Sequence, residues 1–133
     1  MKQYLLNIKG NEKGFLLFEL LVVIVLIGIL GLALSHAAIV IYKMRLKAVN
    51  DSYATQIALE KIEEIAAVDP LTLNDGDSWE ETVERDGRQF QRIATISVND
   101  DSSRTITVSV SPLNSTIGGT ITMNNTYSPW QLN

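Results

Sequence analysis

The chain has 133 residues, of which 46% are hydrophobic and 20% charged, and its formal net charge is −4. This length allows one domain of ordinary size. The chain has no cysteine, which excludes disulfides, thiolate zinc sites and cysteine nucleophiles, and its one histidine, His36, lies inside an apolar run. The acidic balance argues against nucleic acid as a partner. We therefore expect no enzyme activity, no cofactor, no metal site and no nucleic-acid partner.

The first predicted element is a leader, residues 1–14, which carries Lys2, Lys9 and Lys13 against Glu12. A short basic stretch before an apolar run is typical of an export signal. The rest of the chain carries more acidic than basic side chains, but Lys43, Arg45 and Lys47 directly follow the apolar run. The basic residues on the two sides therefore leave the orientation of the span open.

The next element is an apolar run over residues 15–41, whose only charged residue is Glu19. Runs of about 18 or more apolar residues are typical of membrane-spanning helices. We predict a transmembrane helix here, with His36 at the outer interface of the bilayer. Gly28 and Gly31 either permit close approach of another helix or are tolerated flexible points, and both interpretations stay open.

The junction between leader and apolar run, residues 12–22, reads Glu-Lys-Gly-Phe-Leu-Leu-Phe-Glu-Leu-Leu-Val. A basic residue, a glycine, an aromatic residue and a following glutamate in apolar sequence resemble the class III signal of type IV prepilins and pseudopilins. The resemblance implies cleavage between Gly14 and Phe15 by a prepilin peptidase, followed by methylation of the new amino terminus at Phe15. It also implies that Glu19 meets the amino group of a neighbouring subunit and sets the register of assembly.

A second helical segment, residues 43–68, follows the transmembrane segment, residues 15–42. Its apolar residues recur at helical spacing, which predicts one buried face. That face consists of Ala54, Ile57, Ala58, Ile62, Ile65 and Ala66. The charged residues expected mostly on the opposite, solvated side are Glu60, Lys61, Glu63 and Glu64. The Asp69-Pro70 pair ends the helix, because a residue before proline avoids the helical conformation.

Residues 69–133 have the pattern of an antiparallel β-sheet of about four strands. The predicted strands cover residues 82–85, 88–98, 104–111 and 117–123. Asp86-Gly87 predicts a two-residue hairpin turn between the first two. Because such a short segment is marginal alone, we expect its apolar face to pack on the second helical segment. The predicted fold is α+β and pilin-like: a long amino-terminal helix, transmembrane in its first half, packed on a small sheet.

Two groups of acidic residues remain as candidate sites. The clusters Asp75–Asp77 and Asp100–Asp101 have the oxygen atoms that calcium prefers, but they lack EF-hand spacing, and we favour solvated turns. Glu80, Glu81 and Glu84 have the carboxylates of acid-base chemistry, but they sit beside predicted turns. We interpret these three as a solvated strand face.

The resemblance can be narrowed to a subfamily. Residues 58–65, at the end of the predicted helix, and the strand segments 90–93 and 106–110 are similar to V-type minor pilins or I-type minor pseudopilins. The chain also lacks a proline near His36 and a disulfide-closed loop, two features of many major pilins. The resemblance therefore implies a minor structural subunit that primes assembly of a type IV pilus or a type II secretion pseudopilus.

The implied partners are other pilins or pseudopilins through the amino-terminal helix, the prepilin peptidase and an inner-membrane assembly platform. The implied location is the bacterial inner membrane, with the amino terminus cytoplasmic before cleavage and the sheet outside the cytoplasm, and afterwards the filament. The alternative is a single-pass, membrane-anchored extracytoplasmic binding domain with no role in a filament. The state of the mature amino terminus separates these two functions.

Overall fold

The structure, a computed structural model, describes the backbone of residues 2–129 and the side chains of residues 14–129. It contains one long helix, α1 (Lys2–Ala67), a short 3-10 turn, η1 (Pro70–Thr72), and four strands. The strands are β1 (Ser78–Arg85), β2 (Arg88–Val98), β3 (Arg104–Pro112) and β4 (Ile121–Tyr127). A long apolar helix packed on a four-stranded antiparallel sheet is the α+β, pilin-like fold that the sequence predicts.

The chain divides into two units, which we call the helical unit (Met1–Tyr42) and the sheet unit (Lys43–Asn133). In the helical unit, every described side chain from residue 14 to residue 39 is exposed. α1 is long and apolar enough to cross a membrane. The helix was expected from residue 15 but begins at Lys2, because the leader contains no proline to interrupt it.

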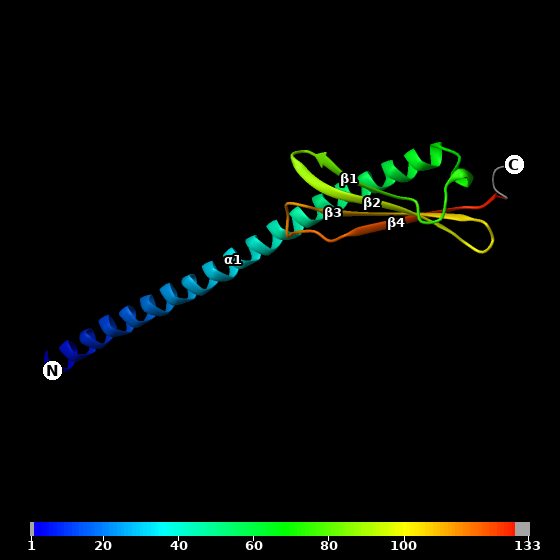
Figure 1. Cartoon of the computed structure of the whole chain (residues 1–133). Coiled ribbons are helices and arrows are strands. Elements are labelled where there is room, and N and C mark those ends of the chain that lie inside the picture. Colours follow the sequence, from blue (N-terminus) through cyan, green and yellow to red (C-terminus); the bar gives the residue numbers. More distant parts are fainter. Residues whose placement is uncertain (1, 130–133) are drawn as a thin grey trace. The chain divides into compact units, whose positions relative to one another are not determined.

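The sheet unit has its strands in the order β1-β2-β3-β4, each antiparallel to the next. Figure 1 shows these strands lying along the part of α1 drawn in green. Asp86 (φ 52°) and Gly87 (φ 71°) connect β1 to β2, and the last register pair is Arg85 with Arg88. Positive φ at both central residues is the geometry of a type I′ turn, which matches the twist of the flanking strands. The predicted hairpin is therefore confirmed.

The core of the sheet unit lies between α1 and one face of the sheet. On the helix, five of the six predicted residues are buried, and Ala66 is half-buried. The buried residues on the sheet are Phe90, Ala94, Ile96, Ile106, Val108 and Val110. Val98, which follows the same alternation, is exposed because it lies in the last β2–β3 pair, next to the turn. The helix stripe and the strand alternation thus form one core, as predicted.

The end of the helix agrees with the sequence to one residue. α1 ends at Ala67, and Asp69 caps the following turn by accepting a hydrogen bond from the Leu71 amide at 3.1 Å. An aspartate before proline suits this role, because its side chain satisfies an amide that has no helical partner.

Two strand boundaries differ from the predicted ones. β1 begins at Ser78, four residues early, because it pairs along β2 as far as Thr95. β4 begins at Ile121, four residues late, since Gly118 has a φ of +121° and belongs to the loop before it. β4 ends at Tyr127, four residues beyond the predicted end of this strand.

Candidate functional site

The residues of the predicted processing signal lie on α1 in the helical unit. Gly14, Phe15 and Glu19 are exposed, and the Phe15 side chain is 70% exposed. Residues four positions apart on a helix share one face, so Phe15 and Glu19 lie on the same side of α1, one turn apart. A Cβ atom added at Gly14 would meet no atom within 4 Å. Among the side chains of residues 14–129, no packing contact therefore requires a glycine at the junction.

Gly28 and Gly31 lie on one face of the same helix, three positions apart. A Cβ atom at either would meet nothing within 4 Å. The hydroxyl of Ser35 donates to the carbonyl oxygen of Gly31 at 2.9 Å, which satisfies this polar group inside the apolar run. α1 passes through both glycines without interruption, so they lie on a regular helix face with no side chain over them.

The apolar surface of the helical unit is far larger than a soluble protein leaves in water. Side chains from Phe15 to Ile39 are exposed around the helix, including Leu32 at 75% and Leu34 at 71%. Contiguous apolar patches of more than a few hundred Å² mark contact with a membrane or with other proteins. This surface of α1 is therefore suited to contact with lipid or with other apolar helices.

The sheet unit contains an unexpected group of charges, the helix–sheet ion cluster, formed by Lys61, Glu64, Glu81 and Arg92. The side chain of Lys61 is only 4% exposed, and its Nζ donates to Glu81 Oε1 at 3.0 Å and to Glu64 Oε1 at 3.1 Å. Arg92 Nε donates to Glu81 Oε2 at 3.0 Å. Glu81 of β1 thus joins a cation of α1 to a cation of β2.

This cluster corrects two predictions. Lys61 was expected on the solvated side of the helix, but it is buried, because its ammonium group reaches Glu81 and lies 5.9 Å from the Trp79 ring centroid. Glu81 was grouped with Glu80 and Glu84 on a solvated face, yet its side chain points toward α1. Glu80 and Glu84, the outward residues of the same strand, are exposed as expected.

The hydrogen bond from Arg92, followed by that from Lys61, holds the pKa of Glu81 below its usual value. Both donors favour the charged carboxylate. The arrangement links α1 to β1 and β2 through charge-assisted hydrogen bonds.

The acidic turns use their carboxylates within the chain. Val98 N donates to Asp75 Oδ1 at 2.9 Å, and Asn74 N donates to Asp77 Oδ2 at 2.9 Å. Hydrogen bonds from the Ser103 hydroxyl and amide hold the pKa of Asp101 below its usual value. Among residues 14–129, no group of three acidic or histidine side chains is placed to hold a metal ion. These aspartates stabilise turns.

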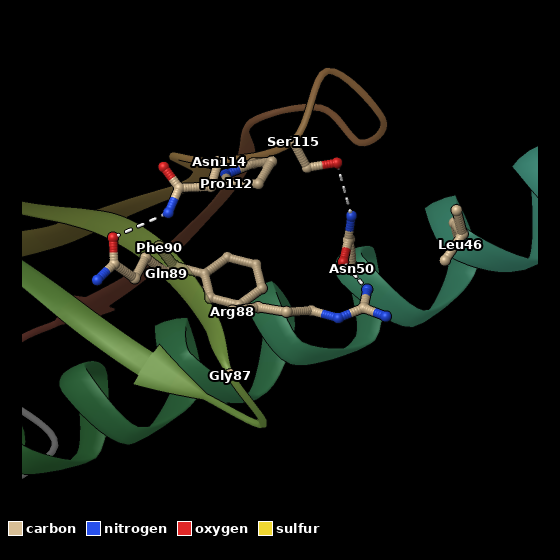
Figure 2. A pocket seen from close by; sticks show the side chains of 9 residues that line it. All are labelled: Leu46, Asn50, Gly87, Arg88, Gln89, Phe90, Pro112, Asn114 and Ser115. Atoms are coloured by element: carbon tan, nitrogen blue, oxygen red, sulfur yellow. Dashed lines mark hydrogen bonds between the residues drawn. The ribbon is translucent and has the colours of Figure 1, made fainter.

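Another arrangement, the Asn50 clamp, joins α1 to two connections at one end of the sheet. Asn50 is 3% exposed, its Nδ2 donates to the carbonyl oxygen of Ile117 at 2.6 Å, and its Oδ1 accepts from Arg88 Nη1. Figure 2 shows Asn50 between Arg88 and Ser115. The clamp thus ties the β1–β2 turn and the β3–β4 loop to one turn of the helix.

A hollow of about 200 Å³ lies beside the clamp. Figure 2 shows Phe90 and Pro112 along it, with the polar groups of Arg88 and Asn114 at its edge. The volume suits a single side chain or a small ligand, and the lining combines an apolar wall with a guanidinium group.

Sequence reasoning missed the ion cluster and the clamp, although one signal was available. Arg92 stands in phase with the inward residues Phe90 and Ala94, and a cation at such a position requires a carboxylate partner. For Asn50, no local pattern distinguishes it from the exposed polar residues of the helix.

Comparisons of the chain with protein-family models, with curated proteins and with solved structures give no match. The fold places the chain in a structural class: α+β proteins in which one long apolar helix, able to span a membrane, also packs on an antiparallel sheet. The particular function is inferred from the residues at the junction.

Proposed function

We propose that this chain is a minor pilin or pseudopilin, a structural and assembly-priming subunit of a type IV pilus or a type II secretion pseudopilus. The observation that carries the proposal is the exposed apolar face of α1 with one carboxylate, Glu19, one turn after Phe15. Gly14 precedes this pair at a position where no described neighbour requires glycine. A peptidase signal and an assembly contact explain all three residues together.

Two environments in turn cover the apolar surface in this proposal. Before assembly the segment 15–41, about 40 Å long at 1.5 Å per residue, spans the bacterial inner membrane, whose apolar core is about 30 Å thick. The sheet unit then lies outside the cytoplasm. In the filament, helices of neighbouring subunits replace the lipid. Burial of each large apolar side chain contributes about 1.5–3 kcal/mol relative to water, so neither state leaves this surface exposed.

Cleavage after Gly14 would create a positive amino group on Phe15 close to the level of Glu19. Opposite charges attract more strongly in an apolar environment than in water, and an unpaired carboxylate there is costly. A helix that brings its amino group to Glu19 of a neighbour therefore stabilises one axial register. Partners in this step are other pilins or pseudopilins and an inner-membrane assembly platform.

Mass spectrometry of the purified mature protein tests the proposal. With an active prepilin peptidase in the host, the amino-terminal peptide should begin at methylated Phe15. In a host without the peptidase, the same peptide should begin in the leader. A chain that retains residues 1–14 in both hosts would contradict the proposal.

A second candidate is a membrane-anchored binding domain without a filament. The hollow between Arg88 and Phe90 favours it, because an apolar wall beside a guanidinium group suits a small carboxylate ligand. This candidate requires no processing at Gly14, so the same mass spectrum distinguishes the two functions. Filaments sheared from cells would also lack the chain.

A further inference from the structure

Positive charge is concentrated at the start of the sheet unit. Residues 43–50 contain Lys43, Arg45 and Lys47 and no acidic residue, whereas residues 51–133 contain five basic and thirteen acidic residues. These three cations follow the apolar run directly. Basic residues beside a membrane helix are usually concentrated on its cytoplasmic side, so a cluster after the span opposes the orientation proposed above. An anionic group bound beside these cations would offset the unfavourable free energy of placing them outside the cytoplasm.

Two of the three cations line a hollow. Lys43, Met44 and Lys47 of α1 and Thr116, Ile117 and Gly118 of the β3–β4 loop line an open hollow of about 480 Å³. Lys43 and Lys47 are four positions apart and share one helix face, whereas Arg45 points away from that face. Among residues 14–129, no carboxylate lies within ion-pair distance of either lysine. Both ammonium groups are therefore available to an external anion.

The loop that completes the hollow is held in place. The Asn50 side chain donates to the Ile117 carbonyl at 2.6 Å, and the Ser115 hydroxyl accepts from Ile117 N at 3.1 Å. Gly118 has a φ of +121°, and a Cβ atom there would lie 3.4 Å from both Asn50 Cβ and Pro112 Cγ. The close approach of the loop to α1 therefore depends on this glycine. The hollow is formed before any ligand arrives.

We propose that this hollow, the Lys43–Lys47 site, binds the phosphate of an anionic phospholipid in the outer leaflet of the membrane that α1 spans. Two ammonium groups on one side and the Thr116 hydroxyl on the other supply donors for phosphate oxygens. Met44, 66% exposed beside them, supplies an apolar contact for the acyl chain. The inference rests on the membrane insertion in the proposed function, which places residue 43 at the level of the headgroups.

Native mass spectrometry of the full-length chain tests this site. The protein is purified in a neutral detergent with equal amounts of phosphatidylglycerol and phosphatidylcholine, and the retained lipids are counted. We expect preferential retention of phosphatidylglycerol. Lys47→Gln should weaken its binding about fivefold, the usual contribution of one basic residue near an anionic surface. The combined Lys43→Gln and Lys47→Gln variant should lose the preference.

Arg45→Gln is the matched control, because it removes the same charge from the same helical turn but from outside the hollow. It should retain phosphatidylglycerol as the unmodified chain does. If Arg45→Gln and Lys47→Gln lose phosphatidylglycerol equally, the lipid is attracted by the general surface charge, and the Lys43–Lys47 site is overturned. Inorganic phosphate that displaces phosphatidylglycerol at equal concentration would overturn the assignment to a lipid.

Carbonate extraction of membranes separates this inference from the function on which it rests. A chain that resists extraction but shows no preference for phosphatidylglycerol overturns the Lys43–Lys47 site alone. A chain that carbonate releases overturns membrane insertion, and with it both proposals. Lys43 and Lys47 are exposed, so neither glutamine substitution removes a core contact.

Discussion

At the scale of single residues, the protonation state of the Glu81 carboxylate affects the stability of the fold. Its pKa is below the usual value in the folded state because Arg92 and Lys61 donate hydrogen bonds to the carboxylate. A carboxyl group with a lowered folded pKa stabilises the fold above its unfolded pKa of about 4.3. That contribution is lost as the pH falls from there through the folded pKa. The helix–sheet ion cluster therefore weakens only as the pH falls below about 4.3.

We predict that Glu81→Gln lowers the free energy of unfolding by about 1–2 kcal/mol at pH 7, an amount reduced because the Glu81 side chain is 39% exposed. Thermal unfolding followed by circular dichroism between pH 3 and pH 7 measures this. The variant should also lose part of the acid dependence. Glu84→Gln, on the outer face of the same strand, is the control and should change stability by less than about 0.5 kcal/mol. Equal effects of the two substitutions would contradict a special role of Glu81.

Gly14→Val should abolish processing. A Cβ atom at this position lies within 4 Å of no described atom, so we expect the helix to accommodate valine and only a peptidase that requires glycine to reject it. On a gel, the variant should keep the mass of the precursor with its leader. Gly10→Val, in the same leader, should be processed normally. Processing of both variants would remove the main ground for the proposed function.

Glu19→Ala should separate processing from assembly. The variant should be cleaved and should insert into the membrane, since removal of a carboxylate favours insertion. It should enter sheared filaments poorly, because the neighbouring amino group loses its partner. Ser35→Ala removes a polar group whose hydrogen bond is internal to the helix, and it should be incorporated normally. Equal incorporation of both variants would show that the charge pair is not needed.

The residues of the processing signal could be predicted from the sequence, because their spacing along one segment defines them. The pairing within the ion cluster could not be predicted from the sequence, because Lys61 and Glu81 lie 20 positions apart. A charged residue on a helix is predicted to be solvated unless the position of the partner that buries it is known. Asn50 has the same difficulty, since its partners Arg88 and Ile117 lie far along the chain.

At the scale of elements, local signals predicted the structure well where they were strong. The Asp86-Gly87 turn and the alternation of apolar residues predicted β2 and β3, and both strands occur at the expected positions. β4 was misplaced because its middle is polar, with Asn124 and Asn125, and because Gly118 is used for close approach to the helix. Strand signals fail where a residue serves tertiary packing rather than local conformation.

We predict that a fragment of residues 43–133 folds as a soluble α+β monomer, whereas a fragment of residues 69–133 is unfolded. The shorter fragment loses the helix face on which the sheet packs, including Ile57 and Ile62, which contribute about 1.5–3 kcal/mol each. The boundary precedes Asn50, because its side chain holds the loop before β4. Amide dispersion in NMR spectra distinguishes the two outcomes.

Ile57→Ala in the longer fragment serves as the graded control. Ile57 is fully buried, and truncation of such a side chain costs about 2–5 kcal/mol. Denaturant unfolding measures the change. A stable, native-like sheet in the 69–133 fragment would contradict the shared core.

At the scale of the whole molecule, the proposed function predicts the number of copies in a filament. A subunit that primes assembly acts when few lateral helix contacts offset extraction from the bilayer, so few copies suffice. Deletion of the chain should reduce filament number or secretion while the major subunit accumulates in the membrane. Quantitative mass spectrometry of sheared filaments should find far less than one copy per major subunit. If this chain is instead the most abundant protein in the filaments, it is the subunit that forms the shaft, and the proposal of a minor subunit is wrong.

The order of the strands has a consequence for how the protein acquires its structure. Each strand pairs with the next one in the sequence, so every hairpin closes a short loop at a small entropic cost. Proteins with such local contacts fold quickly. As the chain emerges from the ribosome, β1 and β2 can dock on the completed second half of α1 before β4 has been synthesised. β4 adds half-buried residues at one edge, so the late part of synthesis completes a sheet unit whose centre has already formed.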